Sequence, residues 1–329
     1  MAHAFDCIVL GTGQAGPSLA TRLAGAGKRV AIVERGSFGG TCVNNGCTPT
    51  KTLVASARAI RMAQRAAEYG VMLDAPPRAD MKAIKARKDA IVRGSTEGVE
   101  GWLRGTDGLT VVQGHARFVS PTEVQVGDDV LSAEQIFINV GARPFVPPMP
   151  GVDEVPFLTN VEMMDVDYLP EHLIVVGGSY IGLEFGQMFR RFGGEVTVVE
   201  RGPTIIGRED ARVSSTVQEI LEAEGIRFET GAECIALTQR DGQVGMTLDC
   251  EGEMREAFGS HILLAVGRVP NTDDLGLEHT GVETNDRGYI DVDDRCRTNV
   301  KGIFALGDVN GRGAFTHTSY NDYEIVAAN

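Results

Sequence analysis

Short apolar runs alternate with amphipathic stretches along much of the chain, a pattern typical of buried parallel strands joined by helices. The first two apolar runs are Cys7–Leu10 and "RVAIVE", which ends at Glu34, and a helical stretch separates them. The same order of strand, turn, helix and strand returns between Leu173 and Glu200. The sequence therefore predicts an α/β fold that contains two copies of one βαβ unit.

Two further patterns outline the organisation of the chain. The segment "DMKAIKARKDAIVRGSTEGVEGWLRG" predicts one long helix, which we expect to pair with the helix after residue 47. The proline-rich segment "RPFVPPMPGV" predicts a crossing between two domains. With 329 residues, the chain is long enough for two or three domains.

The first βαβ copy carries a complete dinucleotide-binding fingerprint, Gly11-x-Gly13-x-x-Gly16, with Glu34 at the end of its second strand. Gly11 permits the tight turn, Gly13 lets the backbone approach a pyrophosphate, and Gly16 lets the helix pack closely on the strand. The helix N-terminus then faces the phosphates. Glu34 is placed to bind ribose hydroxyl groups, so this copy predicts a bound dinucleotide.

The second copy has Gly177, Ser179 and Gly182 at the same positions and ends in Glu200. Serine is small enough to admit a phosphate, although the fit is less close, and a βαβ unit without a ligand is the alternative. A carboxylate at Glu200 accepts hydrogen bonds from a free ribose 2′-hydroxyl and repels a 2′-phosphate, which favours NADH over NADPH. Two dinucleotide sites suggest that one nucleotide is a flavin that receives hydride from the other.

The segment "GGTCVNNGCTPTKT" places Cys42 and Cys47 five positions apart. Within one regular helix their Cα atoms would lie roughly 8–9 Å apart, too far for a disulfide. The residues between them must therefore leave the helix. A zinc site would need a second pair of ligands at matching spacing, and the other four cysteines form none.

A helix is expected to follow, with Thr48 as its N-cap and Pro49 at its first position. Cys47 would then lie at a helix N-terminus, where the dipole favours the thiolate. Lys51, one turn further on, adds positive charge. These features favour a reversible redox disulfide, with a structural disulfide as the alternative.

Composition narrows the possible functions. The formal net charge of −14 argues against a nucleic-acid partner, and no apolar run approaches the ~20 residues that span a membrane. The N-terminus lacks the basic region with which a secretory signal peptide begins. We therefore expect the protein in the cytoplasm. There, structural disulfides are disfavoured. The remaining cysteines are expected to be buried apolar side chains: Cys7, Cys234, Cys250 and Cys296.

Five motifs in order carry a family resemblance: "VLGTGQAG", "GGTCVNNGCTPTKT", "VVGGSYIGLE", "LLAVGRVPNT" and "IFALGD". They resemble those of the class I pyridine nucleotide–disulfide oxidoreductases, the family of glutathione reductase, dihydrolipoamide dehydrogenase and mercuric reductase. The resemblance implies two Rossmann-like, doubly wound domains, with the NAD domain inserted in the FAD domain. The implied boundaries are an FAD domain with the redox-active helix at 1–148, an NAD(P) domain at 149–270, and a segment at 271–329 that completes the FAD site.

The resemblance also implies the roles of individual residues. The FAD site would consist of Gly11, Gly13, Gly16, Glu34, Gly40, Thr41, Lys51, Gly141, Gly307, Asp308 and Thr316. The NAD site would consist of Gly177, Ser179, Gly182, Glu200 and Gly267. The catalytic residues would be Cys47 beside the flavin, Cys42 toward the acceptor, Lys51, its partner Glu184, and Tyr180 over the nicotinamide pocket. Asn139 and Val140, before Gly141, depart from the family's usual small residues.

The implied activity is that of an NAD(P)H-dependent flavoprotein disulfide reductase. Hydride passes from NADH, with NADPH as the second choice, through FAD to the Cys42–Cys47 disulfide and then to a small-molecule disulfide or a metal ion. "GCTPTKT" and "TLVASA" look most like mercuric-reductase-like members. The alternatives are an NAD(P)H oxidase or a quinone or metal-ion reductase that bypasses the disulfide, and a non-catalytic nucleotide-binding redox module.

Family members continue into a dimerisation domain that carries a His–Glu acid–base pair, and no such pair can be assigned in this sequence. A homodimer is therefore expected for a full-length member, whereas the dimerisation domain is absent from this chain. No nucleic-acid or membrane partner and no bound metal is expected.

Overall fold

The computed structural model describes residues 2–250 and 252–329, so Met1, the first residue of the predicted FAD domain, and Glu251 lie outside the described residues. The chain forms two compact units. The first unit comprises Met1–Thr48, Val92–Arg143 and Arg268–Asn329, and the second comprises Pro49–Ile91 and Pro144–Gly267. The chain thus leaves the first unit at the predicted proline-rich crossing and returns immediately after Gly267.

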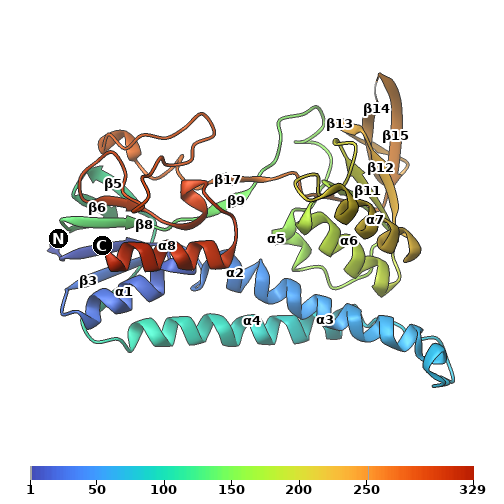
Figure 1. Cartoon of the computed structure of the whole chain (residues 1–329), viewed down its shortest axis with the longest axis horizontal. Coiled ribbons are helices and arrows are strands. Elements are labelled where there is room, and N and C mark those ends of the chain that lie inside the picture. The colour runs from blue at the N-terminus through green and yellow to red at the C-terminus, as the bar shows by residue number, and fades with distance from the viewer. Residues whose placement is uncertain (1, 251) are drawn as a thin grey trace. The chain divides into compact units, whose positions relative to one another are not determined.

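The first unit is built on a five-stranded parallel sheet. In sheet order its strands are β18 (Ile303–Ala305), β8 (Gln135–Ile138), β2 (Cys7–Leu10), β3 (Val30–Glu34) and β4 (Leu109–Gln113). Helices α1 (Ala15–Gly25) and α8 (Thr316–Ala328) lie side by side against it (Figure 1). The order changes direction between β2 and β8, and the glycine-rich turn follows β2.

The two faces of this sheet are covered by different layers, which explains why its strands read as continuous apolar runs. Cys7 and Val9 pack with Leu19 of α1 and Val326 of α8. The alternate residues of the strands pack on a second sheet. That sheet has the order β1 (Ala2–Ala4), β7 (Asp129–Ser132), β6 (Glu123–Val126) and β5 (Ala116–Ser120). Two short 3₁₀ helices complete the unit, η2 (Leu277–His279) and η3 (Gly307–Asn310).

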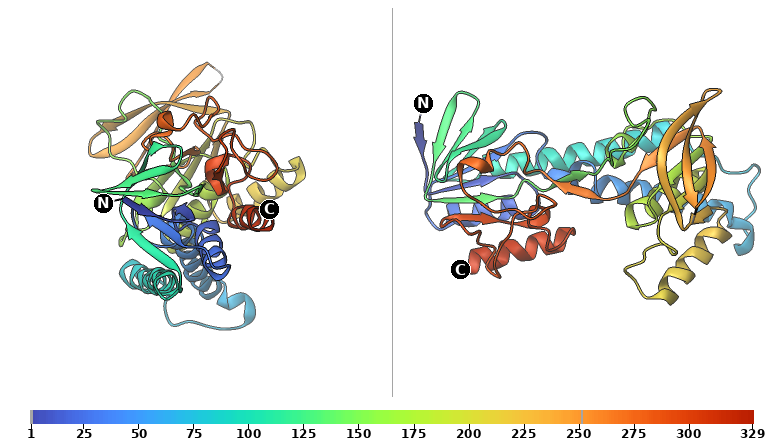
Figure 2. Two further views of the ribbon diagram at one scale, coloured as in Figure 1. Left: turned by 90° about the vertical axis from the view of Figure 1, so that its left-hand side faces the viewer. Right: turned by 90° about the horizontal axis from the view of Figure 1, so that it is seen from above.

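The second unit repeats the arrangement with a four-stranded parallel sheet. Its order is β12 (Arg227–Thr230), β11 (Glu195–Glu200), β10 (His172–Val176) and β16 (His261–Leu264), with helices α5 (Asn160–Met163), α6 (Tyr180–Phe192) and α7 (Ala211–Ala223). An antiparallel meander of β13 (Ala232–Arg240), β14 (Gln243–Cys250) and β15 (Glu253–Gly259) forms a further layer, drawn in orange in Figure 2. Its core includes Met246 and Leu248 beside Ile174 and Ile262 of the parallel sheet.

The cysteine segment forms two helices, α2 (Gly40–Asn44) and α3 (Cys47–Gln64). The prediction that the chain leaves the helix between the cysteines is confirmed, because α2 ends at Asn44 and Asn45 has φ −144°. The predicted start of the second helix is wrong by two residues, since α3 begins at Cys47, ahead of Pro49. A proline within the first turn loses no hydrogen bond, so it tolerates either start.

The long predicted helix is α4 (Met81–Arg104), and α3 and α4 are joined through η1 (Ala66–Tyr69). Two short strands, β9 (Ala142–Pro144) and β17 (Arg268–Pro270), pair where the chain passes between the units. The predicted fold class is confirmed. The segment Pro49–Ile91 groups with the second unit, whereas the sequence boundaries assign it to the first domain. Among the described helices, none is both long and apolar enough to cross a membrane.

Candidate active site

The first glycine-rich turn packs so tightly that two of its three glycines are required by the protein itself. A Cβ atom on Gly11 would lie 2.4 Å from the carbonyl oxygen of Asn139, and Gly11 has φ +98°. A Cβ on Gly16 would lie 2.2 Å from the carbonyl oxygen of Gly11. A Cβ on Gly13 would lie 3.4 Å from its nearest neighbour, which is ordinary contact. Internal packing therefore leaves room beside Gly13, and this is where a pyrophosphate needs it.

Glu34 holds this turn through hydrogen bonds. Its Oε2 accepts from the backbone N of Thr12 at 2.9 Å and from Thr12 Oγ1 at 2.5 Å, and its Oε1 accepts from Gly36 N at 2.8 Å. Thr12 Oγ1 in turn accepts from Gly39 N at 3.0 Å. Glu34, the residue predicted to bind the ribose, is thus also a structural clamp. Thr12 connects Glu34 to Gly39, the N-cap residue of the helix that carries Cys42.

The second unit repeats this clamp. Glu200 Oε2 accepts from Gly178 N and its Oε1 accepts from Gly202 N, both at 2.7 Å. Gly177 and Gly182 are again required, because Cβ atoms there would lie 2.4 Å from the carbonyl oxygen of Ala265 and 2.0 Å from that of Gly177. The two predicted nucleotide turns therefore share one construction.

Ser179 is the N-cap residue of α6 and has an extended backbone, but within the described residues its side chain makes no capping hydrogen bond. Tyr180 follows as the first helical residue. Tyr180 is 45% exposed. Its hydroxyl donates to Glu209 Oε1, and this bond raises the pKa of Tyr180. Glu209 belongs to a loop that is also held to the turn by a bond from Ile206 N to the carbonyl oxygen of Gly178 at 2.8 Å.

The remaining residues of the predicted FAD site lie at the carboxyl ends of β8 and β18. Gly141 has φ +67° and open space around it, and Gly307, with φ +71°, packs against Ser319 of α8. Asp308 is largely buried, and this burial raises the pKa of its carboxyl group. Nε of the buried Arg268 lies 3.6 Å from Asp308 Oδ2 and has no hydrogen-bond partner among the described residues.

Three further predicted residues remain, two in α2 and one directly before β17. Gly40 approaches the first glycine turn, since a Cβ there would lie 2.8 Å from Gly13 Cα, whereas its neighbour Thr41 accepts a bond from Asn45 N at 3.0 Å with its carbonyl oxygen. Gly267, predicted for the NAD site, has φ +136° and open space around the position of a Cβ. A side chain at Gly40 would therefore collide with the first glycine turn, whereas at Gly267 it is the positive φ, not a lack of space, that favours glycine.

Cys42 and Cys47 are not joined by a disulfide, and both contact one hydroxyl group. Thr316 Oγ1, at the start of α8, lies 3.2 Å from Cys47 Sγ and donates to Cys42 Sγ at 3.4 Å. The pKa of Cys42 is raised, first by its hydrogen bond to Cys47 and then by burial, whereas the bond from Thr316 lowers it. Cys42 therefore holds its proton at neutral pH in this arrangement.

The predicted partnership of Lys51 and Glu184 is present as a hydrogen-bonded ion pair between α3 and α6. The two side chains are 63% and 36% exposed, so the ion pair is in contact with solvent. Of the other cysteines, Cys7 and Cys296 are buried as expected, whereas Cys234 and Cys250 are half-buried.

The first unit fits a dinucleotide on two observations. The space beside Gly13 suits a pyrophosphate, and Arg268 Nε, which is ion-paired with Asp308 but makes no hydrogen bond among the described residues, suits a ligand that carries hydroxyl and phosphate groups. The described residues contain no group of three or more His, Cys, Asp or Glu side chains that could hold a metal.

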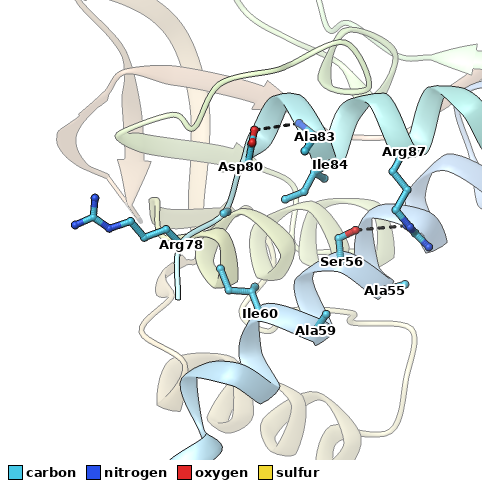
Figure 3. A pocket seen from close by; sticks show the side chains of 10 residues that line it. Ala55, Ser56, Ala59, Ile60, Arg78, Asp80, Ala83, Ile84 and Arg87 are labelled. Atoms are coloured by element: carbon cyan, nitrogen blue, oxygen red, sulfur yellow. Dashed lines mark hydrogen bonds between the residues drawn. The ribbon is translucent and has the colours of Figure 1, made fainter. Parts of the chain in front are cut away.

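A cavity of about 480 Å³ lies elsewhere in the second unit, between α3 and α4 (Figure 3). Alanine side chains and Ile60 and Ile84 form its apolar part, and Arg87 Nη1 donates to Ser56 Oγ at 3.4 Å across one side. None of the described residues that we predicted for the active site lines this cavity.

Residue patterns missed four side chains that shape these sites: Thr12, Asn139, Glu209 and Arg268. Thr12 and Arg268 lie inside motifs that were recognised, yet their partners are distant in sequence. Asn139 carried a signal, because it replaces a small residue of the family pattern. Nothing in the sequence around Glu209 marked it as a site residue.

Two dinucleotide turns and a dithiol in one chain suit an enzyme that moves electrons between nucleotides and sulfur. Residues 5–322 match the pyridine nucleotide-disulphide oxidoreductase family. The dihydrolipoyl dehydrogenase of Chlamydia pneumoniae is 36% identical over 336 residues, which span 100% of this chain and 70% of that protein. RclA of Escherichia coli is 34% identical, over 98% of this chain and 70% of its own.

A solved structure agrees with these relatives. The Cu(II) complex of the HOCl-induced flavoprotein disulfide reductase RclA from Escherichia coli superposes with a TM-score of 0.89 at 33% identity, covering 98% of this chain and 70% of that one. The chain therefore belongs to the pyridine nucleotide-disulphide oxidoreductase family. It is an FAD-dependent oxidoreductase that links NAD(P)H to disulfide chemistry.

Proposed function

We propose that this enzyme uses NADH, with NADPH as a weaker donor, to reduce its own Cys42–Cys47 disulfide and through it an external acceptor. FAD, when bound, accepts hydride from the nicotinamide and supplies electrons to the disulfide. The observation that carries this proposal is the meeting of Cys42 and Cys47 at the hydroxyl of Thr316. The two thiols also hydrogen-bond each other, which supports their forming a disulfide and exchanging it with an acceptor.

Reduction of an acceptor disulfide proceeds by thiol–disulfide exchange. Two electrons and two protons convert the disulfide into two thiols. The Cys42 thiolate attacks one sulfur of an acceptor disulfide, which forms a mixed disulfide and releases the first acceptor thiol. Cys47 then attacks Cys42 Sγ, restores the internal disulfide and releases the second thiol. Because the pKa of Cys42 is raised, its attack requires a base to remove the proton.

Nucleotide binding is assigned to the two glycine turns. We propose that FAD is held by Gly11, Gly13, Gly16, Glu34, Gly40, Thr41, Lys51, Gly141, Gly307, Asp308 and Thr316. We propose that the second unit holds NAD(H) through Gly177, Ser179, Gly182, Glu200 and Gly267. The duplicated clamp of Glu34 and Glu200 supports this assignment. Lys51, held by Glu184, supplies a positive charge for electron transfer.

The acceptor is a disulfide or a soft metal ion. The closely spaced thiols support both, because two thiolates are the ligands that soft metal ions prefer. One similar structure is a Cu(II) complex of RclA, which favours a metal ion as the second candidate acceptor. The relatives named above are dihydrolipoyl dehydrogenases and RclA, so a mercuric acceptor has no particular support. We place the enzyme in the cytoplasm and expect the full-length protein to form a homodimer.

An anaerobic titration of the FAD-loaded protein with NADH, and then with NADPH, tests the proposal. We expect uptake of electrons by both flavin and disulfide, with a long-wavelength absorbance band that C47S abolishes and C42S retains. Direct bleaching of the flavin without that band, in a protein whose acceptor turnover survives both substitutions, would show that the thiols are not an electron relay. An NAD(P)H oxidase that bypasses the disulfide would then be the favoured function.

A further inference from the structure

The position of Asn139 in the sheet points to a role in nucleotide binding. Asn139 follows β8 directly, and its backbone N donates to the carbonyl oxygen of Leu10, the last residue of β2, at 2.8 Å. The strand order reverses between these two neighbouring strands. In open parallel sheets this reversal opens a crevice at the carboxyl ends of the strands, where ligands bind. Asn139 is therefore located at the mouth of that crevice.

The side chain of Asn139 makes hydrogen bonds to the glycine turn that follows β2. Its Nδ2 donates to the carbonyl oxygens of Gly11 and Gly13, both at 3.2 Å, and the residue is only 6% exposed. Two carbonyl acceptors fix the orientation of the amide, since only its NH₂ group can donate to them. These bonds hold both carbonyls on the protein side, so that the backbone N–H groups of the turn remain available to a phosphate.

The other end of the amide lies between two predicted FAD contacts. Asn139 Oδ1 would be 4.0 Å from a Cβ on Gly13 and 3.4 Å from a Cβ on Gly307. It is therefore positioned between the turn after β2 and the turn after β18. A carbonyl oxygen at this place is an acceptor for a hydroxyl group of a ligand that spans the two turns.

We propose that Asn139 is a positioning residue for FAD, which fixes the Gly11–Gly13 turn in its phosphate-binding conformation and presents Oδ1 to the bound dinucleotide. This inference rests on the proposed FAD site of the first unit. It adds a residue that replaces one of the small side chains expected before Gly141.

The test is the affinity of the apoprotein for FAD, measured through the fluorescence of free FAD, together with the Tm of each apoprotein. N139A should weaken FAD binding roughly 5–30-fold, as expected for the loss of two neutral hydrogen bonds. N139D should weaken it further, because its carboxylate faces two carbonyls and the phosphates. N299A is the matched control in the same unit, since Asn299 makes two backbone bonds, to Gly281 O at 2.9 Å and from Glu283 N at 3.0 Å.

We expect N299A to leave the FAD affinity within about twofold of wild type even where it lowers the apoprotein Tm. At saturating FAD, N139A should also change the shape of the bound flavin absorbance, which a loss of stability alone would not do. Wild-type affinity in N139D, or weakening by N139A that N299A matches at equal loss of Tm, would overturn the role of Asn139. If the wild-type apoprotein takes up no FAD, the proposed function itself fails.

Discussion

Thr316 Oγ1 lies 3.2 Å from the sulfur of Cys47, and the same hydroxyl donates to Cys42. One side chain from the last helix therefore contacts both thiols, of which Cys42 lies in α2 and Cys47 begins α3. Thr316 was predicted as a flavin contact, and the structure adds a second role at sulfur. This contact gives the first prediction.

Thr316→Val should slow the reaction of Cys42 with iodoacetamide at pH 7, by about 3–10-fold if one hydrogen bond to the thiolate is lost. The hydroxyl lowers the pKa of Cys42 against the opposing effects of Cys47 and burial, so its removal raises that pKa further. The rate should still climb with pH, because the thiolate is the nucleophile. Thr316→Ser should restore the wild-type profile. An unchanged profile in the valine variant would contradict the assignment.

Gly13 and Gly16 should respond in opposite ways to alanine. G16A should destabilise the apoprotein by about 1–3 kcal/mol, since its Cβ would lie 2.2 Å from a backbone carbonyl oxygen. G13A has room for its Cβ and should keep the wild-type stability, yet bind FAD about tenfold more weakly or worse. Urea unfolding and FAD titration separate the two effects. Equal stability loss in both variants would contradict this division of roles.

The ion pair of Lys51 and Glu184 should contribute little to stability, because both side chains are substantially exposed. Exposed pairs are typically worth less than about 1 kcal/mol. E184Q should therefore leave the Tm almost unchanged and still lower the rate at which NADH reduces the flavin, as stopped-flow absorbance will show. E219Q, at an exposed position of α7, serves as the control. A large drop in Tm with normal reduction would make the pair structural.

Tyr180 and Glu209 should act as one unit in nucleotide binding. Their hydrogen bond holds the ring in one position, so its loss should free the ring and tighten NAD⁺ binding, by roughly 2–5-fold for one exposed bond. Y180F and E209Q should give the same change in dissociation constant, and the double variant should add nothing. Calorimetric titration with NAD⁺ measures this directly. Additive effects would show that the two residues act separately.

The second unit should lose stability in mild acid. Burial lowers the pKa of both His172 and His261, and Arg227 lowers that of His172 further. The unfolded chain then takes up protons first as the pH falls below about 6.5, and stability decreases until the folded-state pKa is reached. Thermal unfolding at pH 7.5 and 5.5 should show a smaller decrease for H172Q than for wild type. An equal decrease would assign the acid sensitivity elsewhere.

Local patterns predicted much of this fold because the glycine spacing and the terminal acids are themselves the cause of the turn geometry. Gly16 and Gly182 are glycines for steric reasons that any sequence with this turn must meet. The motif order then supplied the family, with its FAD and NAD(P)H cofactors. The turns and their acids depend on residues 22 positions apart, whereas the family follows from the order of the motifs along the whole chain.

Contacts between distant segments could not be predicted in this way. The bond from Thr316 to Cys42 spans 274 positions, and that from Asn139 to Gly11 spans 128. The exposure of Lys51 likewise depends on what covers α3, which its own sequence does not encode. The start of α3 at Cys47 rather than Pro49 has a different reason, because proline is compatible with several positions of a first helical turn.

The clamps of Glu34 and Glu200 use the same atoms over the same distance along the chain. Each carboxylate reaches back 22 residues to the turn and forward two residues to a glycine N–H. The two turns are therefore secured by the same internal bonds. The middle position of the turn takes no part in the clamp, so it can differ between the units, with Gly13 in one and Ser179 in the other.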